Sequence, residues 1–176
     1  AKKGLARLDS FDRMKMSAGQ RVSADIMRWS LETTIEGQAW RDYRFPLEQM
    51  RGANVGIVEA LAVRHPLRTV RDAENYVARL RQAAARMDEA RAEAERLAQQ
   101  KTIPPRFILR KTSEQMKRFV ETPLTQNPYV QSFTEKTAGI KGLAPGQRAK
   151  LRAEAEAIVS QQVRPAWRRS IALLDR

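Results

Sequence analysis

His65 has the widest chemical scope of any residue in this sequence, because it is the only histidine among 176 residues. A catalytic zinc site usually takes three protein ligands, typically with more than one histidine. The sequence contains no HExxH motif and no glycine-rich phosphate loop. A Ser–His nucleophile pair stays open, since His65 could meet any serine in space. Its position directly before Pro66, at a predicted helix boundary, favours a packing or surface role instead.

Arg106 is the second residue of chemical interest, because it directly follows two prolines in the stretch TIPPRFILR. Proline fits the first turn of a helix, so Arg106 is predicted to lie near a helix N-terminus. Backbone N–H groups there could join its guanidinium in binding a substrate carboxylate or phosphate. The alternative is a salt bridge that fixes the loop. Arg106 and His65 are the two candidate anion or substrate contacts, and we expect no catalytic and no metal-binding residue.

Carboxylate and aromatic residues offer weaker patterns. Glu32 and Glu36 lie one helical turn apart and could form an acid–base pair, although paired surface glutamates are common. Trp29 and Trp40 could line a groove, but their helical spacing favours packing in the core. A platform that stacks nucleic-acid bases needs aromatic residues interleaved with basic ones. The stretch AWRDYRF at 39–45 is the only one of that kind.

The composition limits the classes of function. The sequence has no cysteine, which excludes disulfides, thiolate metal sites and cysteine nucleophiles. Its net charge is +13, divided as +2 over residues 1–60, +6 over 61–122 and +5 over 123–176. A positive field of this size is the basis for the alternative function, a basic helical module that binds nucleic acid or another polyanion. The charges are scattered among acidic residues, so a solvated surface, or one part of a larger protein with an acidic remainder, is favoured.

The size and hydropathy indicate a single helical domain over residues 1–176. Aromatic residues make up only 6% of the chain, and alanine and arginine are frequent, a mix that favours helices. No apolar run approaches the roughly 18 residues that cross a bilayer, so we expect no membrane span. The start AKKGLARLDS lacks the apolar core of a signal peptide.

Three helices are predicted in the first 100 residues. Residues 17–40 have apolar side chains at helical spacing and Ser17 as an N-cap. Residues 53–63 carry apolar side chains almost all round, as a short buried helix does. Thr69 and Asp72 have the spacing of a capping box before a long helix that ends near residue 100. Its apolar stripe consists of Tyr76, Leu80, Ala83, Met87, Ala90, Ala94 and Leu97.

Prolines mark the later elements. The TIPP stretch is predicted to end the long helix and to start the next one, with Thr102 as cap and both prolines in the first turn. A final helix begins near Pro145, and Pro165 should kink or break it. The predicted fold class is therefore all-α, with long antiparallel helices joined by proline-rich loops and no sheet.

Four stretches occur in the same order as in a known bacterial family. They read LETTIEGQAWRDYRFPLEQMRGANVG, HPLRTVRDAENYVARL, TIPPRFILRKTSEQM and IVSQQVRPAWRRSIALL. Over residues 8–174 the chain resembles the family called domain of unknown function 885. Its members are longer, all-helical, often secreted or lipoprotein-anchored, and similar to zinc metallopeptidases of the HExxH type.

The resemblance implies that this chain is a partial domain, the N-terminal helical wall of such a hydrolase. Because the HExxH part is absent, no metal ligand is carried over to any residue here, and zinc would belong to the missing part. The implied partner is that C-terminal catalytic portion or a separate subunit, and the chain alone would be inactive. A periplasmic or lipoprotein-anchored location is implied as well. Nucleic acid is not expected as the partner.

The final helix is the predicted contact with the missing part. Trp167, Ile171 and Leu174 follow Pro165 and continue almost to the last residue. We expect one side of this helix to be uncovered, which would let the isolated chain self-associate.

Overall fold

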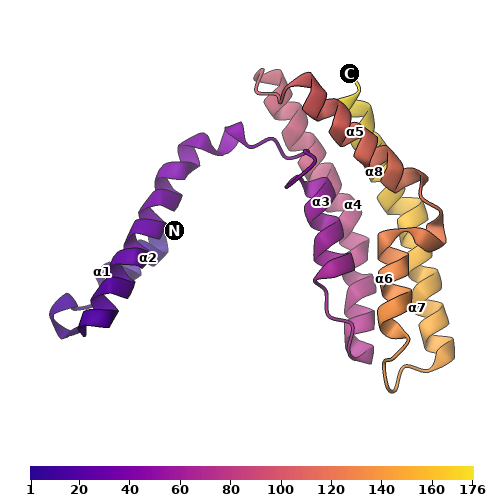
Figure 1. Ribbon diagram of the computed structural model, residues 1–176, viewed down its shortest axis with the longest axis horizontal. Coiled ribbons are helices and arrows are strands. Elements are labelled where there is room, and N and C mark those ends of the chain that lie inside the picture. The colour runs from indigo at the N-terminus through magenta and orange to yellow at the C-terminus, as the bar shows by residue number, and fades with distance from the viewer. The chain divides into compact units, whose positions relative to one another are not determined.

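The computed structural model describes residues 1–176 and contains helical elements only, so the predicted all-α class is confirmed. The chain divides into two compact units, residues 1–44 (unit 1) and residues 45–176 (unit 2) (Figure 1). The single domain over residues 1–176 stays a prediction. None of the helices combines the length and the apolar composition that crossing a bilayer requires.

Unit 1 is a helical hairpin. Helix α1 (Lys2–Asp9) lies alongside α2 (Ala18–Glu36), with a 3₁₀ turn (Arg13–Lys15) between them and a second one (Gly37–Tyr43) after α2 (Figure 1). Ser17 caps α2 as predicted: its hydroxyl accepts from the Gln20 N–H, and the Gln20 side chain accepts from the Ser17 N–H at 2.9 Å. This reciprocal pair satisfies two donors that a helix start leaves free.

Unit 1 has no fully buried residue. The half-buried face of α2, with Leu31 and Ile35, packs against α1, and a Cβ placed on Gly4 would lie 3.3 Å from a Leu31 methyl group. Two ion pairs tie α2 to the preceding segments: Arg28 with Asp9, and Arg13 with Asp25. The hairpin is therefore held by a thin apolar seam and surface charges rather than by a core.

The expected core position of Trp29 and Trp40 is wrong. Their side chains are 69% and 67% exposed. Trp29 lies on the side of α2 that faces away from α1, and Trp40 lies in the 3₁₀ turn after α2, where its one aromatic neighbour, Tyr43, is itself exposed.

Unit 2 is a bundle arranged around one long helix. Helix α4 (Val70–Gln99) contacts α3 (Ala53–Val58), α7 (Pro145–Ile158) and α8 (Arg164–Leu174). Helix α5 (Arg106–Glu121) packs on α8, and α6 (Pro128–Thr137) packs on α7 (Figure 1). Short π-helical segments extend α3 (Glu59–Val63) and connect α7 to α8 (Val159–Val163).

The core of unit 2 follows the predicted stripe of α4. Tyr76, Leu80, Met87 and Leu97 are fully buried, and the small residues of the stripe let neighbouring helices approach closely. Side chains of the later helices complete the core, among them Met116, Tyr129, Phe133, Val159 and Trp167. The capping box predicted for Thr69 and Asp72 is confirmed, with the Asp72 N–H donating to Thr69 at 3.1 Å.

The two π-helical segments end near prolines. Pro66 has no N–H to donate to the Ala62 carbonyl four residues earlier. Helix α6 supplies the missing donors: Ser132 Oγ donates to the Ala62 carbonyl at 2.6 Å, and Lys136 Nζ donates to it at 2.8 Å. The helical segment from α7 through the π-helical turn to α8 continues past Pro165 without a break. The wider π turn is closed by the bond from the Arg164 N–H to the Val159 carbonyl, so the proline is accommodated in the first turn of α8.

Three further sequence predictions need correction. Thr102 does not cap α5; its N–H donates to the Leu97 carbonyl at 3.0 Å and closes α4, and α5 begins after both prolines, at Arg106. Residues 53–63 are only partly buried, because this element packs on α4 and α6 along one side. The final helix is better covered than predicted: Trp167 is 1% exposed and Ile171 is buried, because α4 and α5 both pack on α8, while Leu174 is half-buried.

Candidate interaction surface

His65 is buried and serves packing in unit 2. Its ring meets the ring of Tyr76 edge-on, with the ring centroids 5.4 Å apart, and its Nδ1 has no hydrogen-bond partner. Burial lowers the pKa of the imidazole, with a further contribution from the charges of Arg79 and Lys136. No serine hydroxyl is hydrogen-bonded to it, so the structure forms no Ser–His pair.

Arg106 is exposed at the first residue of α5, as the prolines predicted, and no carboxylate is paired with it. The salt bridge considered for this residue is therefore not formed. His65 precedes α4 and Arg106 follows it, so the 30 residues of that helix separate them by about 45 Å. The two candidate contacts cannot belong to one small-molecule site.

Acidic residues do not assemble into a metal centre. No group of three or more histidine, aspartate or glutamate side chains lies where it could hold a metal ion. Glu32 and Glu36 are exposed on α2, and Glu32 lies 3.9 Å from Arg28. These side chains therefore offer no zinc site, and the resemblance implies zinc only for the part of the family pattern outside this chain.

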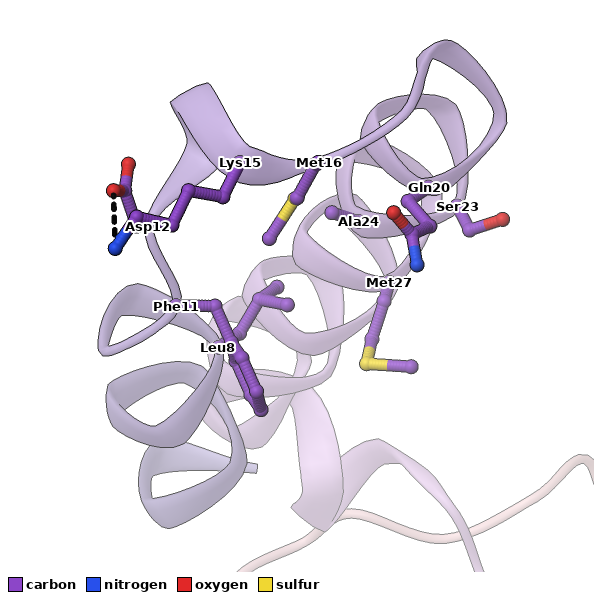
Figure 2. Close-up of a pocket in the computed structure, with 9 residues that line it drawn as sticks. All are labelled: Leu8, Phe11, Asp12, Lys15, Met16, Gln20, Ser23, Ala24 and Met27. Atoms are coloured by element: carbon purple, nitrogen blue, oxygen red, sulfur yellow. Dashed lines mark ion pairs between the residues drawn. The ribbon is translucent and has the colours of Figure 1, made fainter.

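An apolar cavity of about 480 Å³ opens in unit 1, between the end of α1 and the first turns of α2. Figure 2 shows Leu8, Met16 and Met27 pointing toward one space, with Phe11 beside Leu8. Gln20, Ser23 and Ala24 of α2 complete the lining together with Asp12 and Lys15. Thioether and aliphatic side chains of this kind adapt to apolar surfaces of different shape.

Asp12, Lys15 and Gln20 of this cavity are already engaged in local structure. The Asp12 carboxylate accepts from the Met14 N–H at 2.9 Å and lies 3.7 Å from Lys15 Nζ (Figure 2). The Gln20 side chain is held by the capping box. The cavity therefore offers an apolar contact surface, without a free acid–base pair for catalysis.

A second cavity, of about 370 Å³, lies between α6 and α7 and contains two arginines. Arg152 donates to Glu156 at 2.9 Å, and Arg148 donates to the Leu143 carbonyl at 3.4 Å. One of the two positive charges is thus neutralised within the cavity, which leaves a weak anion site at most.

Ion pairs link the helices of unit 2 across its surface. Arg169 of α8 binds Asp88 of α4 through two bonds of 3.0 and 2.5 Å, and Arg81 of α4 binds Glu154 of α7. The hydrogen bonds from Arg169 lower the pKa of Asp88. The arginine charge of α4 and α8 is therefore partly matched by carboxylates and does not form one uninterrupted basic face.

The exposed apolar residues of unit 1 are the ones that sequence reasoning misses. Helical spacing gives no surface role to Phe11, Met14, Val22, Ile26 and Met27, yet all are more than half exposed. The sequence does contain a pattern that could have indicated this exposure. Helix α2 has apolar residues on two opposite faces, whereas a helix at a protein surface needs only one apolar face.

The family model described as "Bacterial protein of unknown function (DUF885)" matches residues 1–176. The crystal structure of the putative lipoprotein from Colwellia psychrerythraea is similar to this chain, with a TM-score of 0.71 and 25% sequence identity. The similarity covers 74% of this chain and 22% of that one, so the chain spans less than a quarter of the length of the solved protein. No curated protein matches the sequence.

Proposed function

Because the chain belongs to the bacterial family of unknown function DUF885, we propose that it forms a non-catalytic helical wall of a larger, zinc metallopeptidase-like hydrolase of the cell envelope. The observation that carries the proposal is the difference in coverage. The chain is matched over 74% of its own length by a structure of which it covers only 22%. Catalytic residues of such a protein would then lie mainly in the part without a counterpart here.

Two properties of the chain support this assignment. Unit 2 has its own core and can act as a rigid scaffold, while unit 1 presents uncovered apolar side chains. Exposed apolar surface of this kind is typical of a protein–protein contact. The envelope location is supported by the similar solved structure, because that protein is described as a putative lipoprotein.

Reconstitution tests the proposal. An HExxH-bearing segment, taken from the continuing reading frame or from a longer family member, is produced separately and mixed with the 176-residue chain. We expect the mixture to bind zinc and to hydrolyse peptides, and the chain alone to do neither. Metal-dependent hydrolysis by the chain alone, or no complex between the two proteins, would contradict it.

The alternative function, polyanion binding, is supported by one feature of unit 1. Trp40 and Tyr43 are exposed with ring centroids 5.8 Å apart, and each is directly followed in the sequence by an arginine, Arg41 and Arg44. Such a site would bind single strands by stacking and would weaken steeply with salt. Sub-micromolar binding of single-stranded DNA at physiological salt, lost in Trp40→Ala, would favour this alternative.

A further inference from the structure

The outer face of α2 carries an apolar stripe that no helix of unit 1 covers. Val22, Ile26 and Trp29 are spaced four and three residues apart, so they line one side of the helix. Their side chains are all more than half exposed. On the opposite side, the half-buried Leu31 and Ile35 face α1. Helix α1 covers only one of the two apolar faces of α2. A helix with two apolar faces is expected to pack between two other elements, so a second packing partner is expected for α2.

The borders of this stripe differ in charge. On the helical wheel, one border carries the carboxylates of Asp25, Glu32 and Glu36, and the other carries Ser23 and Ser30. Arg13 neutralises Asp25 with bonds of 2.5 and 2.7 Å. The carboxylate of Glu32 lies 3.9 Å from the guanidinium of Arg28, which makes a long ion pair, and Glu36 forms no ion pair. The last two turns of α2 therefore present acidic groups that a basic partner would match.

We propose that the stripe Val22–Ile26–Trp29 is the docking face for an amphipathic helix that borders its own apolar residues with lysine or arginine. This helix belongs to the part of the longer family proteins that lies outside the present chain. The assignment rests on the proposed function, since it names the surface by which the wall joins the remainder. Its support is the two-faced pattern of α2, the acidic border, and the 22% coverage of the similar structure.

A second copy of α2 is a poorer match for this surface. An antiparallel pair of α2 helices would place the two acidic borders against each other, and a parallel pair would place carboxylates against serines. Neither arrangement supplies the opposite charge. A basic helix supplies it at the last two turns of α2, where Glu32 and Glu36 lie.

Two synthetic peptides of about 18 residues, or five helical turns, test the proposal. Both carry the same leucine stripe, one bordered by lysine and the other by glutamate, and each is titrated calorimetrically into the full chain. We expect the lysine peptide to bind at least about tenfold more tightly than the glutamate peptide. Ile26→Asp should weaken it by at least about tenfold. Met27→Asp is the matched control, because Met27 lies on the face with the cavity of Figure 2 and its loss should leave binding unchanged.

Charge reversal provides a second test that does not alter the apolar stripe. The double variant Glu32→Lys/Glu36→Lys should reverse the preference between the two peptides, while an unchanged circular dichroism spectrum shows that α2 persists. Loss of binding in Met27→Asp but not in Ile26→Asp would overturn the proposal in favour of the cavity. A dimer of the full chain that Ile26→Asp dissociates would identify a second copy as the occupant and overturn it as well.

The HExxH-bearing segment separates this inference from the proposed function. If the segment binds wild type and Ile26→Asp equally, the docking face is wrong and the proposed function stands. If the lysine peptide binds the stripe but the segment does not bind at all, the proposed function fails, and with it the stated source of the helix.

Discussion

The two units of this chain bury their apolar residues to very different degrees. Unit 2 has a continuous core along α4, with Tyr76, Leu80 and Trp167 almost completely inaccessible to solvent. Unit 1 has no buried residue, and its two helices are held together by a thin apolar seam and surface ion pairs. Tryptophans occur in both, but only the one in unit 2 has partners on all sides. The number of apolar residues therefore says less about stability than the number of helices available to cover them.

The largest contrast is expected between two tryptophan substitutions. Trp167→Ala should destabilise unit 2 by about 3–5 kcal/mol, because it removes a buried ring that stacks on Phe119 and leaves a cavity. Trp29→Ala should change the free energy of unfolding by less than about 0.5 kcal/mol, because the ring is exposed. Urea unfolding followed by circular dichroism measures both. Equal effects would show that the units do not differ in packing as described.

The two capping boxes give a matched pair of smaller effects. Thr69→Ala should lower the unfolding free energy of unit 2 by about 1 kcal/mol, since the Asp72 N–H loses its acceptor. Ser17→Ala removes the same kind of cap from α2 and should reduce only the helical signal of unit 1. Site-resolved amide exchange distinguishes the two. A shift of the α4 amides in Ser17→Ala would show that the units unfold together.

A similar effect, or a slightly smaller one, is expected from Tyr76→Phe. The Tyr76 hydroxyl donates to the Tyr129 carbonyl at 2.9 Å inside the core, so its removal should cost about 1 kcal/mol. Tyr43→Phe is the control in unit 1, where the ring is exposed, and should have no measurable effect. Thermal unfolding of the two variants beside wild type gives the comparison.

The smallest effect is a pH dependence just below pH 6.5, which only unit 2 should show because it contains the single histidine, His65. Burial holds the folded-state pKa of His65 below its ordinary value of 6.5. Above pH 6.5 the neutral ring contributes its full stability; as the pH falls through the folded-state pKa this contribution is lost, because the unfolded chain binds the proton more readily. Carboxylates whose pKa is lowered in the folded state, such as Asp88, change the free energy of unfolding only when the pH falls below their ordinary pKa of 3.8. His65→Gln should flatten the pH dependence of stability below pH 6.5 and above pH 3.8, where no carboxylate with a lowered pKa contributes, and an unchanged slope there would contradict the assignment.

The sequence contains enough information to predict the helices but not their partners. The stripe of α4 and the caps at Ser17 and Thr69 are local patterns, and all are present in the structure. Helical periodicity predicts that Trp29 lies in a core, and the missing later part predicts an uncovered apolar side on the last helix. Trp29 is exposed, and Trp167 and Ile171 of the last helix are buried, because a stripe does not reveal whether a neighbour covers it. The π-helical segment before Pro66 depends on donors from α6, some 70 residues later, which no local pattern contains.

The candidate site is less predictable from the sequence than the fold. His65 and Arg106 are candidates because of their chemistry, and the structure places them at opposite ends of α4, one buried and one exposed. The surfaces that carry our proposals lie in unit 1 and consist of ordinary apolar residues. These residues indicate an interaction surface only because they are exposed, and their exposure is known only from the tertiary structure.

Native-state hydrogen exchange on the whole chain tests the central comparison most directly. Amides of α2 should exchange through local opening with a free energy near zero, and those in the middle of α4 only through global unfolding of unit 2. Addition of the lysine-bordered peptide should slow exchange in α2 and leave α4 unchanged. Protection in α2 equal to that of α4 without any partner would contradict the account, because it would show that unit 1 is stable without a second neighbour.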